Sequence, residues 1–211
     1  MSEIQKHIEK LEKHKISTII RTDDFDHAYN IVKASNEAGI KFVEITLTIP
    51  NALELIKKCS IDFPELSVGA GTVITMEDAK NSLEYGAEYL VSPIAIPEVV
   101  EWAKEQDVLC IAGALTPTEM HTLWKAGADL IKFYPATSMP LDYIKLIHNP
   151  MPEYKFLATG GIDYNNILDY INAGCIAAGV TADLGGAAKT VSYEELVTIA
   201  KKYVEKVNSI K

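Results

Sequence analysis

The chain has 211 residues, of which 48% are apolar, so it is long and apolar enough for one sizeable core. Its formal net charge is −9 and no basic cluster stands out, which argues against nucleic acid and anionic membrane surfaces as partners. No stretch is long and apolar enough to span a bilayer, and the N-terminus, rich in Lys, Glu and His, has no apolar signal region.

The first predicted element is a helix over Ser2–Lys13. Ser2 and Gln5 fit a capping box, in which two side chains satisfy backbone N–H groups at a helix start. An apolar stripe along one face consists of Ile4, Ile8 and Leu11. We expect residues 1–15 to be the N-terminal helix of a single domain that occupies residues 1–211.

After this helix, the chain alternates between apolar-periodic helical segments and short runs rich in Val, Ile and Phe. At four junctions a glycine directly follows a helix, where a left-handed C-cap belongs, and a strand begins at once. Thr116-Pro117-Thr118-Glu119 is a capping box with Pro at the first helical position. The predicted strands are Ser17–Thr22, Lys41–Leu47, Leu66–Gly71, Glu88–Ser92, Val108–Ala112, Asp129–Tyr134, Lys155–Thr159 and Cys175–Val180.

Eight strands with intervening helices indicate a parallel sheet. Because the units are equal and no linker or second domain interrupts them, we predict closure into a (β/α)8 TIM barrel. The alternative is a doubly wound open sheet, which usually has fewer strands and two different edges. In a barrel, chemistry takes place at the carboxyl ends of the strands, so polar residues late in strands are the candidates for a site.

Lys132 is the first such candidate, because it lies in the middle of an apolar strand closed by Pro135. A buried ammonium without a partner is costly, so the lysine either reaches water, pairs with a carboxylate, or serves as a nucleophile. Apolar surroundings favour the neutral amine, and a neutral amine can attack a carbonyl to form a Schiff base.

Glu44 is the second anomaly, since it alternates with apolar residues in its predicted strand. Val43 and Ile45 should face the helices, which turns Glu44 into the barrel. Alternate strands of a barrel contribute to the same interior layer, so Glu44 and Lys132 could meet. Such a pair is either structural or catalytic, and a purely structural pair would be expensive compared with an apolar core.

Several residues in the predicted loops suit anion binding. Gly160 and Gly161 follow the seventh strand, in a region where barrels commonly bind phosphate, although they could simply permit a tight turn. Arg21 could clamp a carboxylate or phosphate, or form a salt bridge to Asp23 or Asp24. Thr72 could bind a substrate carboxylate or cap the next turn.

No metal or cofactor is expected, because no cluster of His, Cys or carboxylates has ligand spacing. Cys59, Cys110 and Cys175 are widely scattered, so we expect reduced core thiols in a cytoplasmic protein.

Several motifs occur together in register: Val43-Glu44-Ile-Thr-Leu, Val68-Gly-Ala-Gly-Thr-Val73, Val91-Ser92-Pro93, Leu115-Thr116-Pro117-Thr-Glu119, Ile131-Lys132-Phe-Tyr-Pro135-Ala and Thr159-Gly-Gly-Ile162. In this order they resemble the class I aldolases that cleave 2-keto-3-deoxy-6-phosphogluconate (KDPG) and 4-hydroxy-2-oxoglutarate (KHG). The resemblance spans nearly the whole chain, from about the first predicted strand to the eighth.

The resemblance implies a homotrimeric barrel without metal, acting on a small keto acid. It implies that Lys132 forms the Schiff base with the keto carbon of a pyruvate unit and that Glu44 shuttles protons through a bound water. Arg21 and Thr72 would lie at the substrate-binding end, with Pro93 in the pocket wall. Gly160 and Gly161 would present N–H groups to a phosphate.

The chain departs from the family pattern at the ends of several strands. Thr48 stands where many members have an arginine, Ile94 follows Pro93, and Ala182 replaces a phosphate-binding serine. Thr181 could substitute for that serine, whereas Asp183 would repel an anion if it faced the pocket. The exact substrate therefore stays open, including another 2-keto-3-deoxy sugar acid. Two competing hypotheses are a phosphate-binding barrel isomerase or synthase without an imine step, and a barrel that only binds a metabolite.

Overall fold

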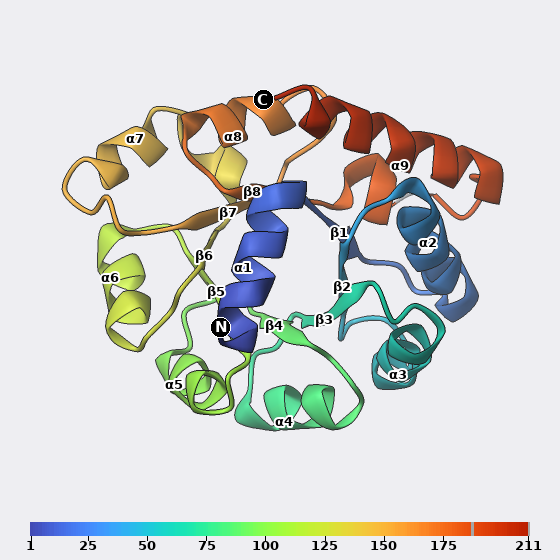
Figure 1. Cartoon of the computed structure of the whole chain (residues 1–211), viewed down its shortest axis with the longest axis horizontal. Coiled ribbons are helices and arrows are strands. Elements are labelled where there is room, and N and C mark those ends of the chain that lie inside the picture. The colour runs from blue at the N-terminus through green and yellow to red at the C-terminus, as the bar shows by residue number, and fades with distance from the viewer. Residues whose placement is uncertain (187, 211) are drawn as a thin grey trace.

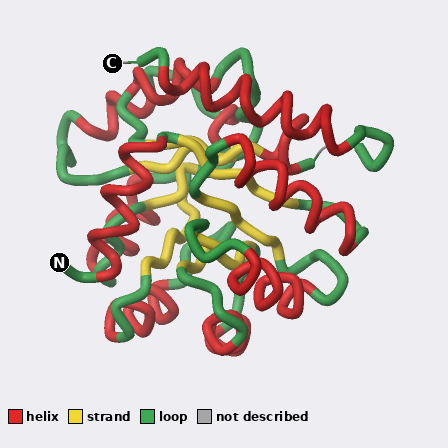
Figure 2. Tube along the Cα trace, turned by 45° about the vertical axis from the view of Figure 1, so that its right-hand side comes forward, coloured by secondary structure: helices red, strands yellow, loops and turns green. Residues whose placement is uncertain are grey.

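The computed structural model describes residues 1–186 and 188–210, and these residues form a closed parallel barrel (Figures 1 and 2). Each strand pairs in parallel with the next, and the last pairs with the first. The strands are β1 (Ile16–Ile20), β2 (Phe42–Thr46), β3 (Ser67–Gly71), β4 (Tyr89–Val91), β5 (Leu109–Ala114), β6 (Ile131–Phe133), β7 (Phe156–Thr159) and β8 (Ala177–Val180). The predicted (β/α)8 barrel is confirmed, and the doubly wound alternative is wrong.

Helices surround the barrel, and one crosses its end. Figure 1 shows α1 lying across the ring of strands, whereas the other helices pack around the outside. The helices are α1 (Glu3–His14), α2 (Phe25–Ala38), α3 (Ala52–Asp62), α4 (Met76–Glu84), α5 (Pro97–Glu105), α6 (Pro117–Lys125), α7 (Tyr143–His148), α8 (Ile167–Ala173) and α9 (Tyr193–Asn208). Within the described ranges, no helix is long and apolar enough to cross a membrane.

Local sequence signals set most helix ends. The capping box of Thr116 and Glu119 is formed, and the glycines after α2, α4, α6 and α8 all have positive φ. The box predicted at Ser2 is only half formed. The Ser2 side chain accepts from the Gln5 backbone N–H, but the Gln5 side chain donates to Glu9 instead. Asp107, from the turn before β5, accepts from the Glu3 backbone N–H at 2.8 Å and completes the helix start.

Alternate residues along each strand face opposite sides of the barrel wall, so the apolar side chains form two separate cores. Val43 and Ile45 of β2 pack outward against the helices. Phe42 of β2 and Leu130 point into the barrel, where they meet the apolar stripe of α1. Because Phe42, Tyr89 and Leu109 begin their strands, this inner core closes the amino-terminal end of the barrel. The carboxyl-terminal end stays available for a site.

Candidate active site

Lys132 and Glu44 face each other inside the barrel. Lys132 lies on β6 between Gly113 of β5 and Leu157 of β7. Its Nζ is 3.5 Å from Oε1 of Glu44, and the two side chains are only 6% and 2% exposed. The structure therefore brings together the two ionisable groups that the alternation of residues along their strands predicted to face inward.

Glycines on the neighbouring strands leave the space that this pair occupies. A Cβ at Gly71 would lie 2.2 Å from Oε1 of Glu44, so only glycine leaves room for that carboxylate. A Cβ at Gly113 would lie 2.4 Å from the carbonyl oxygen of Pro93. Since Gly113 pairs with Lys132, the Pro93 backbone lies against the strand next to the one that carries the amine. Oε1 of Glu44 has no hydrogen-bond partner among the described residues, which leaves an acceptor within the site.

Arg21 lies just beyond β1, held by two threonines. Its guanidinium donates to Oγ1 of Thr48 at 3.1 Å and to Oγ1 of Thr72 at 3.2 Å. Arg21 forms no ion pair with Asp23 or Asp24 within the described part of the chain, so that alternative is wrong. Both carboxylates lie near Lys189 instead, at 2.6 and 3.9 Å. Arg21 and Thr72 are thus together, and Thr48, which appeared only as a departure from a pattern, belongs with them.

The glycines after β7 form a tight, left-handed turn. Gly160 and Gly161 have φ of 92° and 78°, a conformation that favours glycine. A Cβ at Gly161 would lie 2.2 Å from Oγ1 of Thr137, so the loop after β6 packs directly on this turn. Thr137 Oγ1 donates to the Gly160 carbonyl oxygen at 3.3 Å.

The turn after β8 begins at Thr181, whose carbonyl oxygen accepts from the Gly186 N–H at 2.8 Å. Asp183 accepts a hydrogen bond from the Tyr203 hydroxyl of α9 at 2.6 Å. Burial raises the pKa of Tyr203, and the hydrogen bond to Asp183 raises it further. The carboxylate of Asp183 is therefore bound to a helix on the outside of the barrel, which removes the expected objection to an anion near Thr181.

A family model described as KDPG and KHG aldolase matches residues 7–201. The chain belongs to that family. The 2-dehydro-3-deoxy-6-phosphogalactonate aldolase of Escherichia coli K12 is 30% identical over 199 residues, which cover 92% of this chain and 97% of the relative. The KHG/KDPG aldolase of the same organism is 28% identical over 193 residues, 89% of each chain.

Structural similarity agrees with the family. A KDPG aldolase of Zymomonas mobilis ZM4 superposes with a TM-score of 0.86 at 24% identity, covering 94% of this chain and 95% of the other, which supports the barrel fold. The predicted family and the predicted enzyme class, an aldehyde-lyase, are confirmed. The roles predicted for individual residues of this KDPG and KHG aldolase family member stay predictions.

Two inward polar residues were given no role at the predicted site, although Thr159 is one of the polar residues late in a strand that the barrel prediction makes candidates. Thr159 ends β7, two residues beyond Leu157, which points into the inner core, so its parity was a usable signal. Its Oγ1 is buried without a partner among the described residues. Tyr89 has a similarly unpartnered hydroxyl, but an aromatic residue in a short strand gave no signal of a polar role.

Proposed function

We propose that this protein is a class I aldolase that cleaves KDPG, KHG or both to pyruvate and an aldehyde. The aldehyde would be glyceraldehyde 3-phosphate from KDPG and glyoxylate from KHG. The observation that carries this proposal is the buried contact between Lys132 and Glu44, which supplies an amine and a proton carrier side by side in the barrel interior.

The reaction begins when the Lys132 amine attacks the keto carbon of the substrate. Glu44 delivers a proton through a relay water to the carbinolamine oxygen; the C–O bond then breaks, that oxygen leaves as a second water molecule, and a protonated imine remains. Removal of the proton from the C4 hydroxyl then breaks the C3–C4 bond, and the bonding electrons move into the imine. The aldehyde departs, C3 of the resulting enamine takes up a proton, and hydrolysis returns pyruvate and the free amine.

The remaining predicted residues bind the ends of the substrate. Arg21, held by Thr48 and Thr72, suits a carboxylate at the mouth of the barrel. Pro93, whose carbonyl oxygen lies against Gly113 of the neighbouring strand, would form part of the pocket wall. Gly160, Gly161 and Thr181 would bind a phosphate, when the substrate carries one, through backbone N–H groups and a hydroxyl.

We also infer that the chain assembles as a homotrimer and acts in the cytoplasm. Ile74 and Ile94, in the loops after β3 and β4, are 51% and 53% exposed and would give an assembly apolar surface to bury. Sedimentation velocity tests the trimer; a single monomeric species at micromolar concentration would exclude it.

Reductive trapping tests the chemistry directly. Borohydride added with pyruvate should inactivate the protein and add a pyruvyl-derived mass to the Lys132 peptide. Lys132→Met should abolish both the adduct and turnover. Lys10→Met is the matched control, because burial lowers the pKa of Lys10 although it lies on α1, away from the mouth. Absence of an adduct on Lys132 in the wild-type protein would favour an isomerase, a synthase or a binding protein.

A direct comparison of substrates resolves the choice of keto acid. Pyruvate release from KDPG, KHG and an unphosphorylated 2-keto-3-deoxy sugar acid should be measured with lactate dehydrogenase as the coupling enzyme. A phosphate site built from Gly160, Gly161 and Thr181 predicts a lower KM for the phosphorylated acid. Equal KM values for phosphorylated and unphosphorylated acids would contradict the proposed phosphate site.

A further inference from the structure

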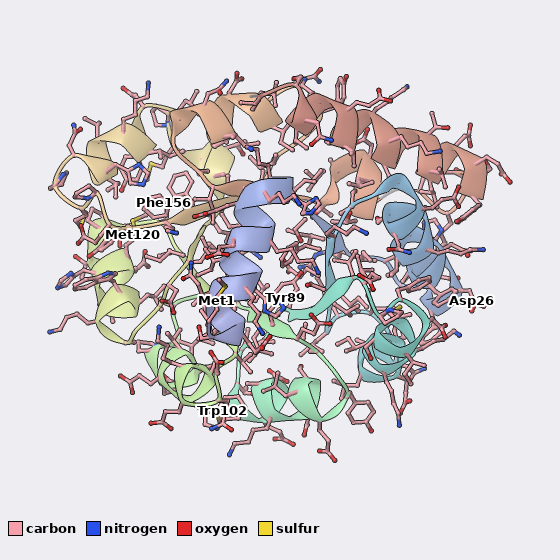
Figure 3. All side chains as sticks on the ribbon, viewed as in Figure 1. Met1, Asp26, Tyr89, Trp102, Met120 and Phe156 are labelled. Carbon is pink, nitrogen blue, oxygen red and sulfur yellow. The ribbon has the colours of Figure 1, made fainter. Side chains whose placement is uncertain are left out.

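Tyr89 places a hydroxyl group in the middle of the barrel. It begins β4, is 2% exposed, and packs edge-to-face on Phe42 with ring centroids 5.6 Å apart. Figure 3 shows Tyr89 near the centre of the molecule beside α1, whereas Trp102 lies at the outer rim. The fold therefore places a phenol among the apolar side chains of the inner core, with Ser17 and His7 beside it.

The ring of Tyr89 reaches toward Glu44. Gly69 of β3 lies between the two residues in the sheet, since it pairs with Glu44 on one side and Tyr89 on the other. A Cβ at Gly69 would lie 2.3 Å from Cζ of Tyr89, so the far end of the ring occupies the space of the missing side chain. The Cζ–O bond consequently extends past β3 toward the strands that carry Glu44 and Ser17.

The hydroxyl remains a hydrogen-bond donor at all ordinary pH values. Burial raises the pKa of Tyr89 well above its usual value; a hydrogen bond with the Ser17 side chain lowers this pKa, and the charges of Glu44 and Glu88 raise it. Ser17 lies beside the Tyr89 hydroxyl, and Oε1 of Glu44 faces Lys132 Nζ at 3.5 Å, but neither oxygen makes a close, well-aligned hydrogen bond among the described residues. A buried donor and a buried acceptor with spare hydrogen-bonding capacity thus occupy adjoining parts of the same interior.

We propose that Tyr89 is a positioning residue for the aldolase reaction: its hydroxyl donates, through one buried water, to the Glu44 carboxylate and fixes it opposite Lys132. The inference rests on the proposed function. A bridging water is nearly as good as a direct contact. Tyr89 consequently holds the Glu44 carboxyl group in the orientation that proton transfer requires.

Tyr89→Phe tests this role, because it removes the hydroxyl and keeps the ring. We expect kcat to fall by up to about tenfold and the shape of its pH profile to change, because the carboxyl group that carries the proton loses the hydroxyl that orients it. The KM for the keto acid should change by less than about twofold, since the hydroxyl contacts no substrate. An unchanged pH profile would overturn the proposal. A Tyr89→Phe variant that is fully active and more stable than the wild type would also overturn it, because that result is expected of a buried hydroxyl without a hydrogen-bonding role.

Two controls isolate the hydroxyl. Tyr170→Phe removes the hydroxyl of another buried tyrosine, on α8 outside the barrel, and should leave the profile unmoved. His7→Asn addresses the titratable ring nearest to Tyr89, 6.3 Å away between centroids and bonded to Glu88 at 3.1 Å. If His7→Asn changes the pH profile of kcat as Tyr89→Phe does, the effect comes from the contact with α1 and the proposal fails.

Two further measurements keep the test independent of folding and of the proposed function. A high-resolution crystal structure of the wild-type protein should show a water bridging Oη of Tyr89 and Glu44; electron density without that water would overturn the proposal. Borohydride trapping with pyruvate should precede the kinetics. Failure to trap Lys132 in the wild-type protein contradicts the aldolase itself, whereas normal trapping with an unchanged Tyr89→Phe profile contradicts only the role of Tyr89.

Discussion

Gly71→Ala tests whether the position of the Glu44 carboxylate, and not only its chemical identity, governs the reaction. The new methyl group would lie 2.2 Å from Oε1 and 2.5 Å from Cγ of Glu44, whereas ordinary contact begins near 3.4 Å. The carboxylate must therefore retreat by about 1.2 Å, because the methyl group is fixed on β3 and the backbone cannot yield without distorting the barrel.

The expected loss of activity follows from that displacement. A misplacement of about 1 Å in a catalytic group lowers the rate by roughly 100-fold. Overpacking should also lower the free energy of unfolding by about 1–3 kcal/mol. We expect kcat for pyruvate release to fall about 100-fold at 25 °C, while circular dichroism shows a folded protein with a reduced melting temperature.

Gly86→Ala is the control for destabilisation. Gly86 has φ of 93° and a Cβ there would lie 2.8 Å from Oγ of Ser60, so the substitution strains the backbone at the turn after α4. This variant should lose stability and keep its kcat. The reasoning is refuted if Gly71→Ala keeps wild-type kcat, or if both variants lose activity in proportion to their stability.

Three other predictions concern the buried groups. Glu44→Gln should slow borohydride-trappable imine formation by about 10²- to 10⁴-fold, and an unchanged rate would make Glu44 structural. Burial raises the pKa of Cys59, Cys110 and Cys175 to about 12, so a colorimetric thiol reagent should titrate them only after urea is added; rapid reaction of the native protein would contradict this burial. Because these folded-state pKa values lie above the unfolded value of 9.0, their contribution to stability is complete below about pH 9 and is lost as pH rises toward 12. Urea unfolding should accordingly show a falling free energy between about pH 9 and 11, and a flat profile there would refute the assignment.

The sequence predicted the barrel because its signals were local and repeated. The alternation of Val43, Glu44 and Ile45 was enough to assign one inward carboxylate, since parity in a strand has only two outcomes. The same argument turned Lys132 inward. That the two groups lie 3.5 Å apart, however, depends on the register of all the strands between β2 and β6, which no local pattern encodes.

Side chains with several possible partners were predicted less well. Arg21 had two acidic neighbours in sequence, yet it donates to Thr48 and Thr72, from the ends of β2 and β3. Gln5 likewise had the spacing of a capping box, but Asp107 reaches the start of α1 from more than 100 positions away. In both cases a closed barrel supplies distant partners that compete with local ones, and local spacing carries no information about them.

The helix across the barrel end links stability to chemistry. Ile4, Ile8 and Leu11 of α1 close the amino-terminal end, and burial of each such side chain contributes about 1.5–3 kcal/mol. That closure keeps water from reaching the interior on the side opposite the mouth. A substrate must then approach Lys132 past Arg21 and the loops at the carboxyl ends of the strands. The features that stabilise one end of the barrel therefore leave the other end as the side from which the amine can be reached.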